Sequence, residues 1–130
     1  MINVIIPSDS AFADYENEIK NLYENSKSKI GDSNSFEFVK DNTLFYMFVK
    51  NEKLIGGIYY FLDNGKLFLN GFAGRKHFED NLECVKMSLN WFKCDIYAES
   101  QNRASALCLL KCGFEKIGHN LFKFTQPKIL

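Results

Sequence analysis

The chain contains few of the residues that interrupt or cross-link a fold. It has 2 prolines, 8 glycines and 4 cysteines in 130 residues, and no repeat or low-complexity linker divides it. Its cysteines form no C-x-x-C pair and lie in segments with helix or strand patterns; they are Cys84, Cys94, Cys108 and Cys112. We therefore expect reduced, mostly buried thiols of an intracellular protein, not a disulfide framework.

The chain also lacks an excess of either charge and any long apolar run. Lys plus Arg and Asp plus Glu each number 16, so the formal net charge is zero, which argues against general nucleic-acid binding. No segment approaches the ~20 apolar residues that span a bilayer. The first residues lack a basic start, and their apolar run ends at Pro7, unlike a signal peptide. We expect a cytoplasmic protein without a membrane partner.

Apolar and aromatic residues are abundant. Hydrophobic residues make up 46% of the chain and aromatic residues 15%, including 13 Phe and 6 Tyr. Such bulky side chains allow a small protein to bury a large area per residue. The length fits one domain, so we expect residues 1–130 to form a single hydrophobic-core domain.

The N-terminal third predicts one strand and one helix. Asn3 to Ile6 is a short β-favouring run, and Pro7-Ser8-Asp9 supplies a stop and an N-cap. Apolar residues at helical spacing predict a helix that ends near Ser26; they are Phe12, Tyr15, Ile19 and Leu22. We interpret Ser26 to Asn42 as a loop with one short helical turn near Phe36 to Val39.

The middle of the chain predicts an antiparallel meander. Three β-favouring segments, Thr43 to Lys50, Leu54 to Leu62 and Lys66 to Phe72, are separated by two turn signals. These signals are Asn51-Glu52-Lys53 and Asp63-Asn64-Gly65. Connections this short join antiparallel strands as hairpins.

Helical periodicity returns in the last third. The apolar face of a long helix is formed by Phe78, Leu82, Val85, Leu89 and Phe92. A strand at Asp95 to Glu99, a helix at Asn102 to Cys112 and strands at Phe114 to Ile117 and Leu121 to Phe124 follow. A strand reached through a crossover helix lies parallel to its predecessor. The prediction is an α/β (α+β) domain of order β-α-βββ-α-β-α-ββ, with helices on both faces of a mixed, mostly antiparallel sheet.

The Asn102 to Phe114 segment is the most informative motif. Asn102 is a good N-cap, and Gly113 can adopt the left-handed conformation that closes a helix. The helix between them is apolar nearly all round, so we expect it to be covered on more than one side. The spacing of Asn102, Ser105, Gly113 and Phe114 resembles the final helix of the GNAT superfamily of acetyl-CoA-dependent N-acetyltransferases. The hairpin at Asn51 to Gly57 and the order of elements resemble the same fold.

This resemblance implies acetyl-CoA as the cofactor. In the family two parallel strands splay apart, and backbone N–H groups of the first strand bind the acetyl carbonyl. The corresponding residues here are Asn70 and Gly71, and Asn102 begins the helix on the other side of the gap. The next helix would present its N-terminus to the pyrophosphate, with Arg75, Lys76 and His77 as a basic cluster beside it.

Two departures from the family pattern put the usual activity in doubt. Phe78 and Asp80 occupy the two glycine positions of the pyrophosphate loop, and Glu79 adds further negative charge there. Leu109 stands where the family often has a tyrosine that protonates the leaving thiolate. We name Tyr97 and Glu99, which alternate onto one face of the preceding strand, as replacement acid or base.

The sequence leaves more than one function open. We expect a GNAT-fold protein with an eroded or atypical acetyl-CoA site that acts by binding a protein partner, because small GNAT-like virion and head-assembly proteins of phages show the same losses. Such a protein would lie in a bacterial or phage-infected cell, or in the virion. The alternatives are an active N-acetyltransferase and an unrelated α+β binding module. Exposed aromatic strands would favour homo-oligomers. Cys108, Cys112 and His119 are too few for a zinc site, so we expect no metal.

Overall fold

The computed structural model describes residues 1–74 and 76–127. Within these residues it contains four helices and seven strands, in the order β1 (Ile2–Ile5), α1 (Phe12–Ser26), α2 (Phe36–Asn42), β2 (Leu44–Lys50), β3 (Lys53–Asp63), β4 (Lys66–Ala73), α3 (Phe78–Leu89), β5 (Ile96–Glu99), α4 (Arg103–Lys111), β6 (Glu115–Gly118) and β7 (Leu121–Phe124). The predicted element order is confirmed, with α2 as an addition.

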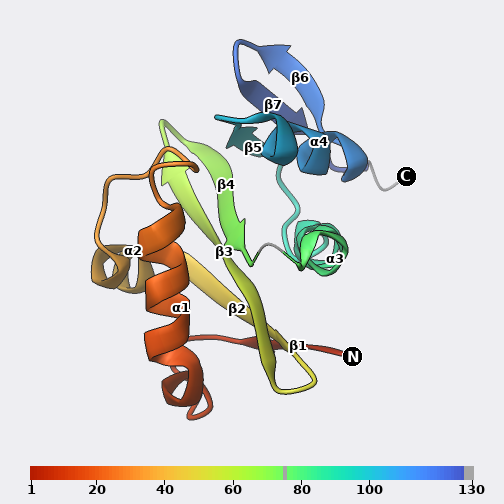
Figure 1. Ribbon diagram of the computed structural model, residues 1–130. Helices are drawn as coiled ribbons and strands as arrows, with labels where there is room; N and C mark the ends of the chain where they lie inside the picture. The colour runs from red at the N-terminus through yellow and green to blue at the C-terminus, as the bar shows by residue number, and fades with distance from the viewer. Residues whose placement is uncertain (75, 128–130) are drawn as a thin grey trace.

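All the strands belong to one sheet with the order β1-β2-β3-β4-β5-β7-β6. Neighbouring strands are antiparallel except β4 and β5, which are parallel and connected through α3. The predicted parallel pairing after the crossover helix is thus confirmed. Helices α1 and α2 cover one face of the sheet, whereas α3 and α4 lie on the other side (Figure 1).

Each face of the sheet has its own hydrophobic cluster. Beneath α1 and α2 the cluster is strongly aromatic, and Tyr23, Phe36, Phe45, Tyr59 and Phe72 form edge-on and stacked pairs in it. The cluster beneath α3 and α4 is mainly aliphatic and includes three cysteines. These three cysteines are free and buried, whereas Cys94 is free and exposed. The alternating strand pattern supplies both clusters, because successive side chains point to opposite faces.

Two hairpins of the meander use the same two-residue turn. Asn51 and Glu52 have φ angles of 51° and 62°, and Asn64 and Gly65 have φ angles of 51° and 76°. Two consecutive positive φ angles define the turn whose twist matches that of the flanking strands. Asn and Gly enter this conformation easily, whereas Glu52 does so at a conformational cost.

The segment between α1 and β2 is more helical than the sequence predicts. Helix α2 runs over Phe36–Asn42, and its N-terminus is capped by Ser35, whose Oγ accepts a hydrogen bond from the Phe38 N–H at 3.1 Å. Phe36 and Val39 are buried against the sheet. The polar residues that favour a loop interpretation form the solvent face of this short helix, and two buried side chains are enough to dock it.

The predicted N-cap of α1 is wrong. The Asp9 carboxylate accepts a hydrogen bond from the Ile6 N–H at 2.9 Å, which closes a turn before the helix. The residue at the N-cap position is Ala11, whose methyl group cannot accept a hydrogen bond. Asp9 therefore stabilises the approach to α1 and not its first turn.

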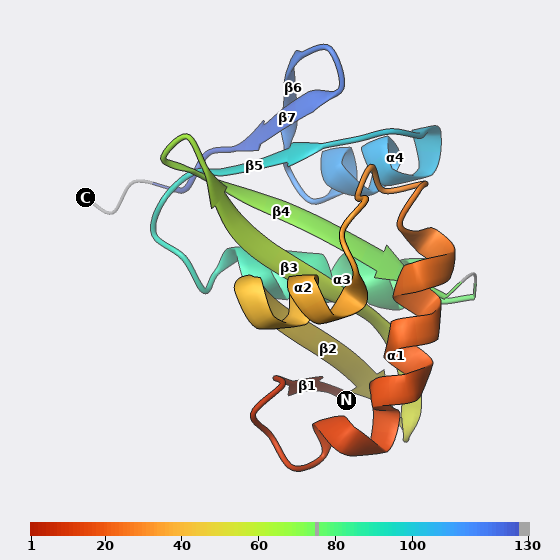
Figure 2. The ribbon, with the colours of Figure 1, turned by 90° about the vertical axis from the view of Figure 1, so that its left-hand side faces the viewer.

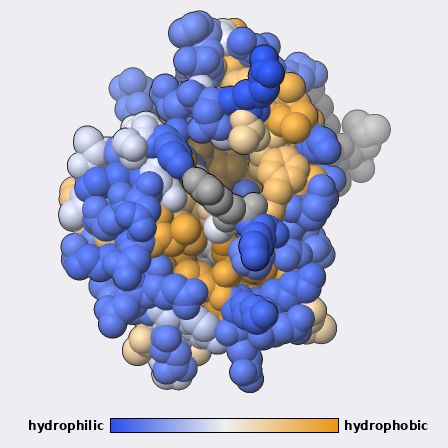
Figure 3. All heavy atoms as spheres, viewed as in Figure 1, coloured by the Kyte–Doolittle hydropathy of each residue, from blue (hydrophilic) through white to orange (hydrophobic). Residues whose placement is uncertain are grey.

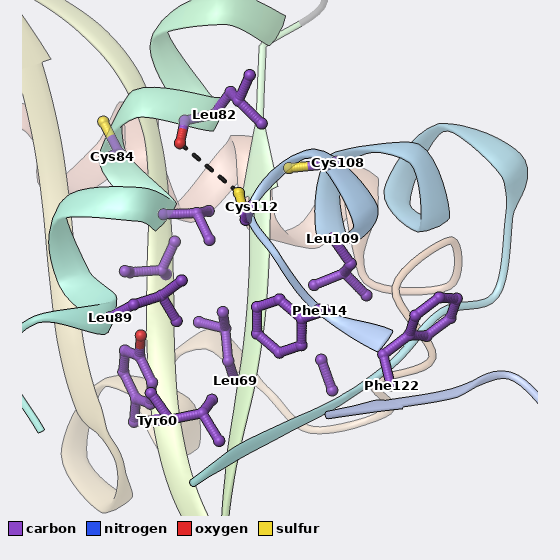
Figure 4. Packing of buried hydrophobic residues seen from close by; sticks show 14 of the residues in the cluster. Tyr60, Leu69, Leu82, Cys84, Leu89, Cys108, Leu109, Cys112, Phe114 and Phe122 are labelled. Atoms are coloured by element: carbon purple, nitrogen blue, oxygen red, sulfur yellow. Dashed lines mark hydrogen bonds between the residues drawn. The ribbon is translucent and has the colours of Figure 1, made fainter. Parts of the chain in front are cut away.

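Helix α4 has both of its predicted ends. The Asn102 Oδ1 accepts a hydrogen bond from the Ser105 N–H at 2.8 Å. At the other end Gly113 has a φ of 96°, the Phe114 N–H donates to the Leu109 carbonyl at 3.0 Å, and the Gly113 N–H donates to the Leu110 carbonyl at 3.1 Å. This is a Schellman motif, which buries Phe114 beside Leu109 (Figure 4).

One expectation about α4 does not hold. Leu107 and Leu110 are 46% and 52% exposed, so the outer side of the helix is not covered within the described residues. Its inner side packs against α3, where the Cys112 Sγ approaches the Leu82 carbonyl at 3.8 Å (Figure 4). An apolar sequence is therefore compatible here with a helix that is covered on one side.

Candidate functional site

Strands β4 and β5 separate soon after they begin to pair. Their register contains Leu67 with Ile96 and Phe68 with Tyr97, and within the described chain it extends no further. Strand β4 continues to Ala73, so its last residues have no neighbour on this side. Figure 2 shows the two strands diverging like the arms of a V, with α1 and α4 at the open end.

A cavity of about 90 Å³ fills the opening between the separated strands. Leu69 and Gly71 line it from β4, Ala98 and Glu99 from β5, and Asn81 from α3. Its walls are mainly apolar, but the side chains of Asn70, Asn81 and Glu99 bring polar groups into it. The splayed parallel pair that the resemblance implies is therefore present, and the space between its strands is open.

A wider groove of about 420 Å³ leads from this cavity to the surface. It lies between the C-terminal turn of α1, the end of β4 and the first turns of α3 and α4. Five residues line both the groove and the cavity, namely Ile30, Gly71, Asn81, Ser105 and Cys108. Figure 3 shows this face hollowed, with apolar side chains around the depression.

A third space of about 250 Å³ opens on the opposite side of the splay. Asp32, Asp63 and Glu99 contribute carboxylates to its lining, beside the rings of Phe61 and Phe68. It shares Leu69, Asn70 and Glu99 with the central cavity. The three spaces share lining residues, and we refer to them together as the channel. Its acidic end would attract a cation.

The Asn70 side chain sits at the centre of a hydrogen-bond network in this channel. Its Oδ1 accepts from the Gly71 N–H at 2.9 Å, and its Nδ2 donates to the Ile30 carbonyl at 3.1 Å and to the Tyr59 hydroxyl oxygen at 2.9 Å. The Tyr59 hydroxyl donates in turn to Asp32 at 2.5 Å, and burial together with Asp32 raises the pKa of Tyr59 above its usual value. Asn70 therefore occupies the Gly71 N–H, the group to which the family resemblance assigns an acyl carbonyl.

The segment that follows α1 is held by hydrogen bonds at the open end of the splay between β4 and β5. The Asn102 Nδ2 donates to the Lys29 carbonyl at 3.2 Å, and the Asn70 Nδ2 holds the next carbonyl, that of Ile30. Ile30 lines all three spaces. Asn70 and Asn102, two residues that the sequence assigns to cofactor binding, thus border the channel from opposite sides and fix the segment between them.

The start of α3 departs from the arrangement that the sequence predicts for a pyrophosphate site. Asp80 is turned to Lys50, whose Nζ lies 3.0 Å from its Oδ1, and this contact lowers the pKa of Asp80. His77 Nδ1 is 3.7 Å from the other Asp80 oxygen. Among the residues that the structure describes, Phe78 lines the groove whereas Lys76, His77 and Asp80 do not. Arg75 lies outside the described residues, so its assignment to phosphate remains a prediction.

The two candidate catalytic residues on β5 have different surroundings. Glu99 lines both the central cavity and its acidic end. The Tyr97 ring packs on Phe68 with centroids 5.8 Å apart, and Lys66 and Lys123 lie over it. Within residues 1–74 and 76–127, Tyr97 lines none of the three spaces. The proposed roles of both residues remain predictions, but Glu99 is the one within reach of a ligand in the channel.

Helix α4 presents a thiol to the channel. Leu109, at the position of the family's tyrosine, is buried in the core and also reaches the cavity wall. Its neighbour Cys108 lines both the cavity and the groove. The Cys112 thiol one turn later lowers the pKa of Cys108 by hydrogen bonding, and this same interaction raises the pKa of Cys112.

Asn81 is a channel residue that sequence reasoning missed. Its amide oxygen is buried and has no hydrogen-bond partner among the described residues. Asn81 lies three residues after Phe78 and four before Val85, so it falls on the apolar stripe of α3. A polar residue on that stripe is the signal that could have identified it.

A channel through a splayed parallel pair, flanked by the helices before and after the second strand, defines the fold of the GNAT acyltransferases. Solved structures show the same fold. An aminoglycoside 6′-N-acetyltransferase from Enterococcus faecium is 13% identical, with 99% of both chains covered and a TM-score of 0.69. Ribosomal-protein-S5-alanine acetyltransferase from Vibrio fischeri is 16% identical, with 96% of this chain and 92% of that chain covered and a TM-score of 0.67.

A third similar structure was solved with a bound ligand. Aminoglycoside acetyltransferase AAC(6′)-Ib, in complex with coenzyme A, is 12% identical, with 96% of this chain and 95% of that chain covered and a TM-score of 0.67. Neither a protein-family model nor a curated protein sequence matches the chain. In the part of the chain that the structure describes, no helix is long and apolar enough to span a membrane.

Proposed function

We propose that the protein binds acetyl-CoA or a related acyl-CoA and transfers the acyl group to an amine. The observation that carries this proposal is the channel, that is, the three spaces that share lining residues at the splay. Its groove enters between α3 and α4, its centre lies in the splay, and its acidic end opens on the opposite side. An acyl thioester threaded through the groove would meet an acceptor from the other end at the point where β4 and β5 separate.

The acceptor end favours a positively charged amine. Asp32, Asp63 and Glu99 line it, and like-charged carboxylates attract a cation before it reacts. In the proposed reaction Glu99 takes a proton from the ammonium group, and the amine nitrogen then attacks the thioester carbonyl. The carbon–sulfur bond breaks, and the electron pair leaves with the thiolate of the carrier. The extra proton on the attacking nitrogen passes to this thiolate, which leaves an amide and a free thiol. The channel mainly contributes by holding the two reactants in line.

The carbonyl oxygen of the thioester requires a hydrogen-bond donor as negative charge develops on it. The Gly71 N–H is suitably placed at the open edge of β4, but the Asn70 Oδ1 occupies it in this structure. The acyl group would have to replace that side-chain oxygen.

A second candidate is a GNAT-fold protein that binds a partner without catalysing transfer. The occupied Gly71 N–H, Leu109 in place of a tyrosine and Phe78 in the groove wall favour it. The exposed Leu107 and Leu110 on the outer side of α4 offer a contact surface for another protein or for a second copy of this chain. A role in a phage virion or in head assembly is one form of this candidate.

Release of free thiol from acetyl-CoA in the presence of amines tests the two candidates. The acceptors would be a polyamine, an aminoglycoside and a lysine peptide. Each would be tested with the wild-type protein and with the variants Glu99→Gln and Tyr97→Phe. We expect Glu99→Gln to lower kcat by about 10²-fold or more, as for a general base, and Tyr97→Phe to retain activity. Binding of acetyl-CoA without thiol release for any of these amines would favour the partner-binding candidate.

A further inference from the structure

The Asn70 carboxamide is held in one orientation by contacts on both of its sides. Its Oδ1 accepts a hydrogen bond from the Gly71 N–H at 2.9 Å, and its Nδ2 donates to the Ile30 carbonyl and to the Tyr59 hydroxyl oxygen. Both N–H donors and the oxygen of this amide are therefore engaged. A flipped amide would place its own N–H groups against the Gly71 N–H, so the network specifies the orientation in which Oδ1 covers that N–H.

Tyr59 connects this contact to the acidic end of the channel. It is the cross-strand partner of Asn70 in the β3–β4 hairpin, and its ring is buried. Its hydroxyl accepts the hydrogen bond from Asn70 and donates its own proton to the Asp32 carboxylate. A hydroxyl that donates to a charged carboxylate becomes a stronger acceptor, because hydrogen bonds in a chain polarise one another. Asp32 therefore strengthens the hold on Asn70 without contacting it.

Asp32 faces the end of the channel from which an amine would arrive. It lines the acidic space together with Asp63 and Glu99. Among the residues that the structure describes, no Lys, Arg or His forms an ion pair with any of these three carboxylates. An ammonium group that reaches Asp32 draws charge from its carboxylate and weakens the hydrogen bond that Tyr59 donates to it. The acceptor thus meets the outer end of a chain of hydrogen bonds whose inner end covers the Gly71 N–H.

We infer that Asp32, Tyr59 and Asn70 form an autoinhibitory relay. Without an acceptor, the Asn70 Oδ1 takes the place of an acyl carbonyl at the Gly71 N–H, and a cation at Asp32 releases it. The inference rests on the proposed function and adds an order of events, in which the acceptor prepares the site for the acyl group. Tyr59 is a positioning residue, because it acts only through its two neighbours in the relay. Its consequence is that a bound thioester is not polarised for attack by water before an amine is in place.

Comparing acetyl-CoA with coenzyme A isolates the relay, because coenzyme A has no acyl carbonyl to compete with Asn70. Calorimetry would measure both Kd values. We expect the wild type to bind the two within about twofold of each other, and Tyr59→Phe to bind acetyl-CoA at least about fivefold more tightly than the wild type, with the Kd of coenzyme A unchanged. Asn70→Ala, which removes the competing oxygen, should reproduce this result. Tyr23→Phe is the matched control, because the equally buried Tyr23 hydroxyl donates to the Asn34 carbonyl at 2.8 Å instead, and it should alter neither Kd.

A cation that cannot be acylated tests the outer end of the relay. Tetramethylammonium carries a permanent positive charge and suits a space lined by carboxylates and by the rings of Phe61 and Phe68. Its effect would be compared with that of sodium chloride at the same ionic strength. We expect tetramethylammonium to lower the Kd of acetyl-CoA for the wild type by at least about threefold and to leave that of coenzyme A unchanged. In Tyr59→Phe, where the relay is already broken, the cation should have no such effect.

The outcomes separate the relay from the proposed function. An equal change in both Kd values in Tyr59→Phe, no change in either, or a cation effect that persists in this variant would overturn the inference and leave the proposed function intact. If neither acetyl-CoA nor coenzyme A binds the wild type at millimolar concentration, the proposed function is contradicted, and the inference fails with it.

Discussion

The two helices that flank the channel differ in how closely they follow the family pattern. Helix α4 has an N-cap hydrogen bond from the Ser105 N–H to Asn102 and a Schellman motif at Gly113. Helix α3 has His77 at its N-cap position, and this side chain makes no cap hydrogen bond among the described residues. The first turn of α3 carries two carboxylates. The features that match the pattern in α4 are helix caps, which stabilise the ends of that helix. The departures in α3 lie in its first turn, where Asp80 contacts Lys50.

The largest effect in this comparison should come from the core of α4. Leu109→Ala removes a buried side chain that packs beside Phe114, and we expect a loss of about 2–5 kcal/mol in the free energy of unfolding. Urea denaturation measures it, and Leu107→Ala on the exposed side of the same helix should change it by less than about 0.5 kcal/mol. Equal effects of the two changes would contradict the structural role given to Leu109.

The C-terminal end of α4 gives the next largest effect. Gly113 has a φ of 96°, so Gly113→Ala places a Cβ in the left-handed region and should cost about 1–2 kcal/mol of unfolding free energy. Gly118→Ala is the control, because the nearest atom to its added Cβ lies at 3.7 Å and its φ is not positive. The control should be neutral in the same denaturation experiment. A neutral Gly113→Ala would mean that the Schellman motif does not form.

The N-terminal ends of the two helices can be compared directly. Asn102→Ala removes the α4 cap and should cost about 1 kcal/mol of unfolding free energy. His77→Ala, at the corresponding position of α3, removes no cap hydrogen bond and should cost a few tenths of a kcal/mol. Thermal unfolding of both variants checks the difference. If His77→Ala proved the more destabilising, the contrast between the two helix starts would fail.

The smallest effect is the pH dependence of the Lys50–Asp80 contact. Hydrogen bonding by Lys50 lowers the pKa of Asp80 in the folded state, so the pair stabilises the fold above the unfolded pKa of about 3.9. This contribution is lost as the pH falls through the lower, folded pKa. We expect Asp80→Asn to be slightly less stable than the wild type at pH 7 and to match it once the pH has fallen below the folded pKa of Asp80. Unfolding curves across this pH range measure the difference in stability between Asp80→Asn and the wild type, with Glu79→Gln as the control. A difference that stays constant with pH would mean that the contact contributes nothing.

Much of this architecture could be predicted from local sequence signals. The strand patterns, the Asn64-Gly65 turn and the Asn102 and Gly113 caps each have a local physical cause, and the structure confirms them. Helix α2 was predicted only as one short turn near Phe36 to Val39 within a loop, because these two residues alone anchor it and docking on the sheet outweighs its polar sequence. The α1 cap was mispredicted because Asp9 can close a turn as readily as it can cap a helix.

The site could be predicted only in part. Asn70, Gly71, Glu99 and Asn102 all border the channel, because their places follow from the order of the elements. The contact of Asn70 with the Gly71 N–H could not be predicted, because it depends on the rotation of the Asn70 side chain and the spacing of residues in the sequence does not determine that rotation. The pairing of Asp80 with Lys50 joins residues 30 positions apart in the sequence, and it changes how charge is distributed at the start of α3.

Thermal unfolding during a titration with acetyl-CoA tests the central claim, that the channel binds an acyl-CoA. Ala104→Trp is the matched variant, because Ala104 is exposed and lines only the groove, where an indole would block entry. At a concentration one hundred times the Kd, acetyl-CoA should add about 2.7 kcal/mol to the stability of the wild type and nothing to that of Ala104→Trp. No shift of the wild type at millimolar acetyl-CoA, or an equal shift in both proteins, would contradict the claim.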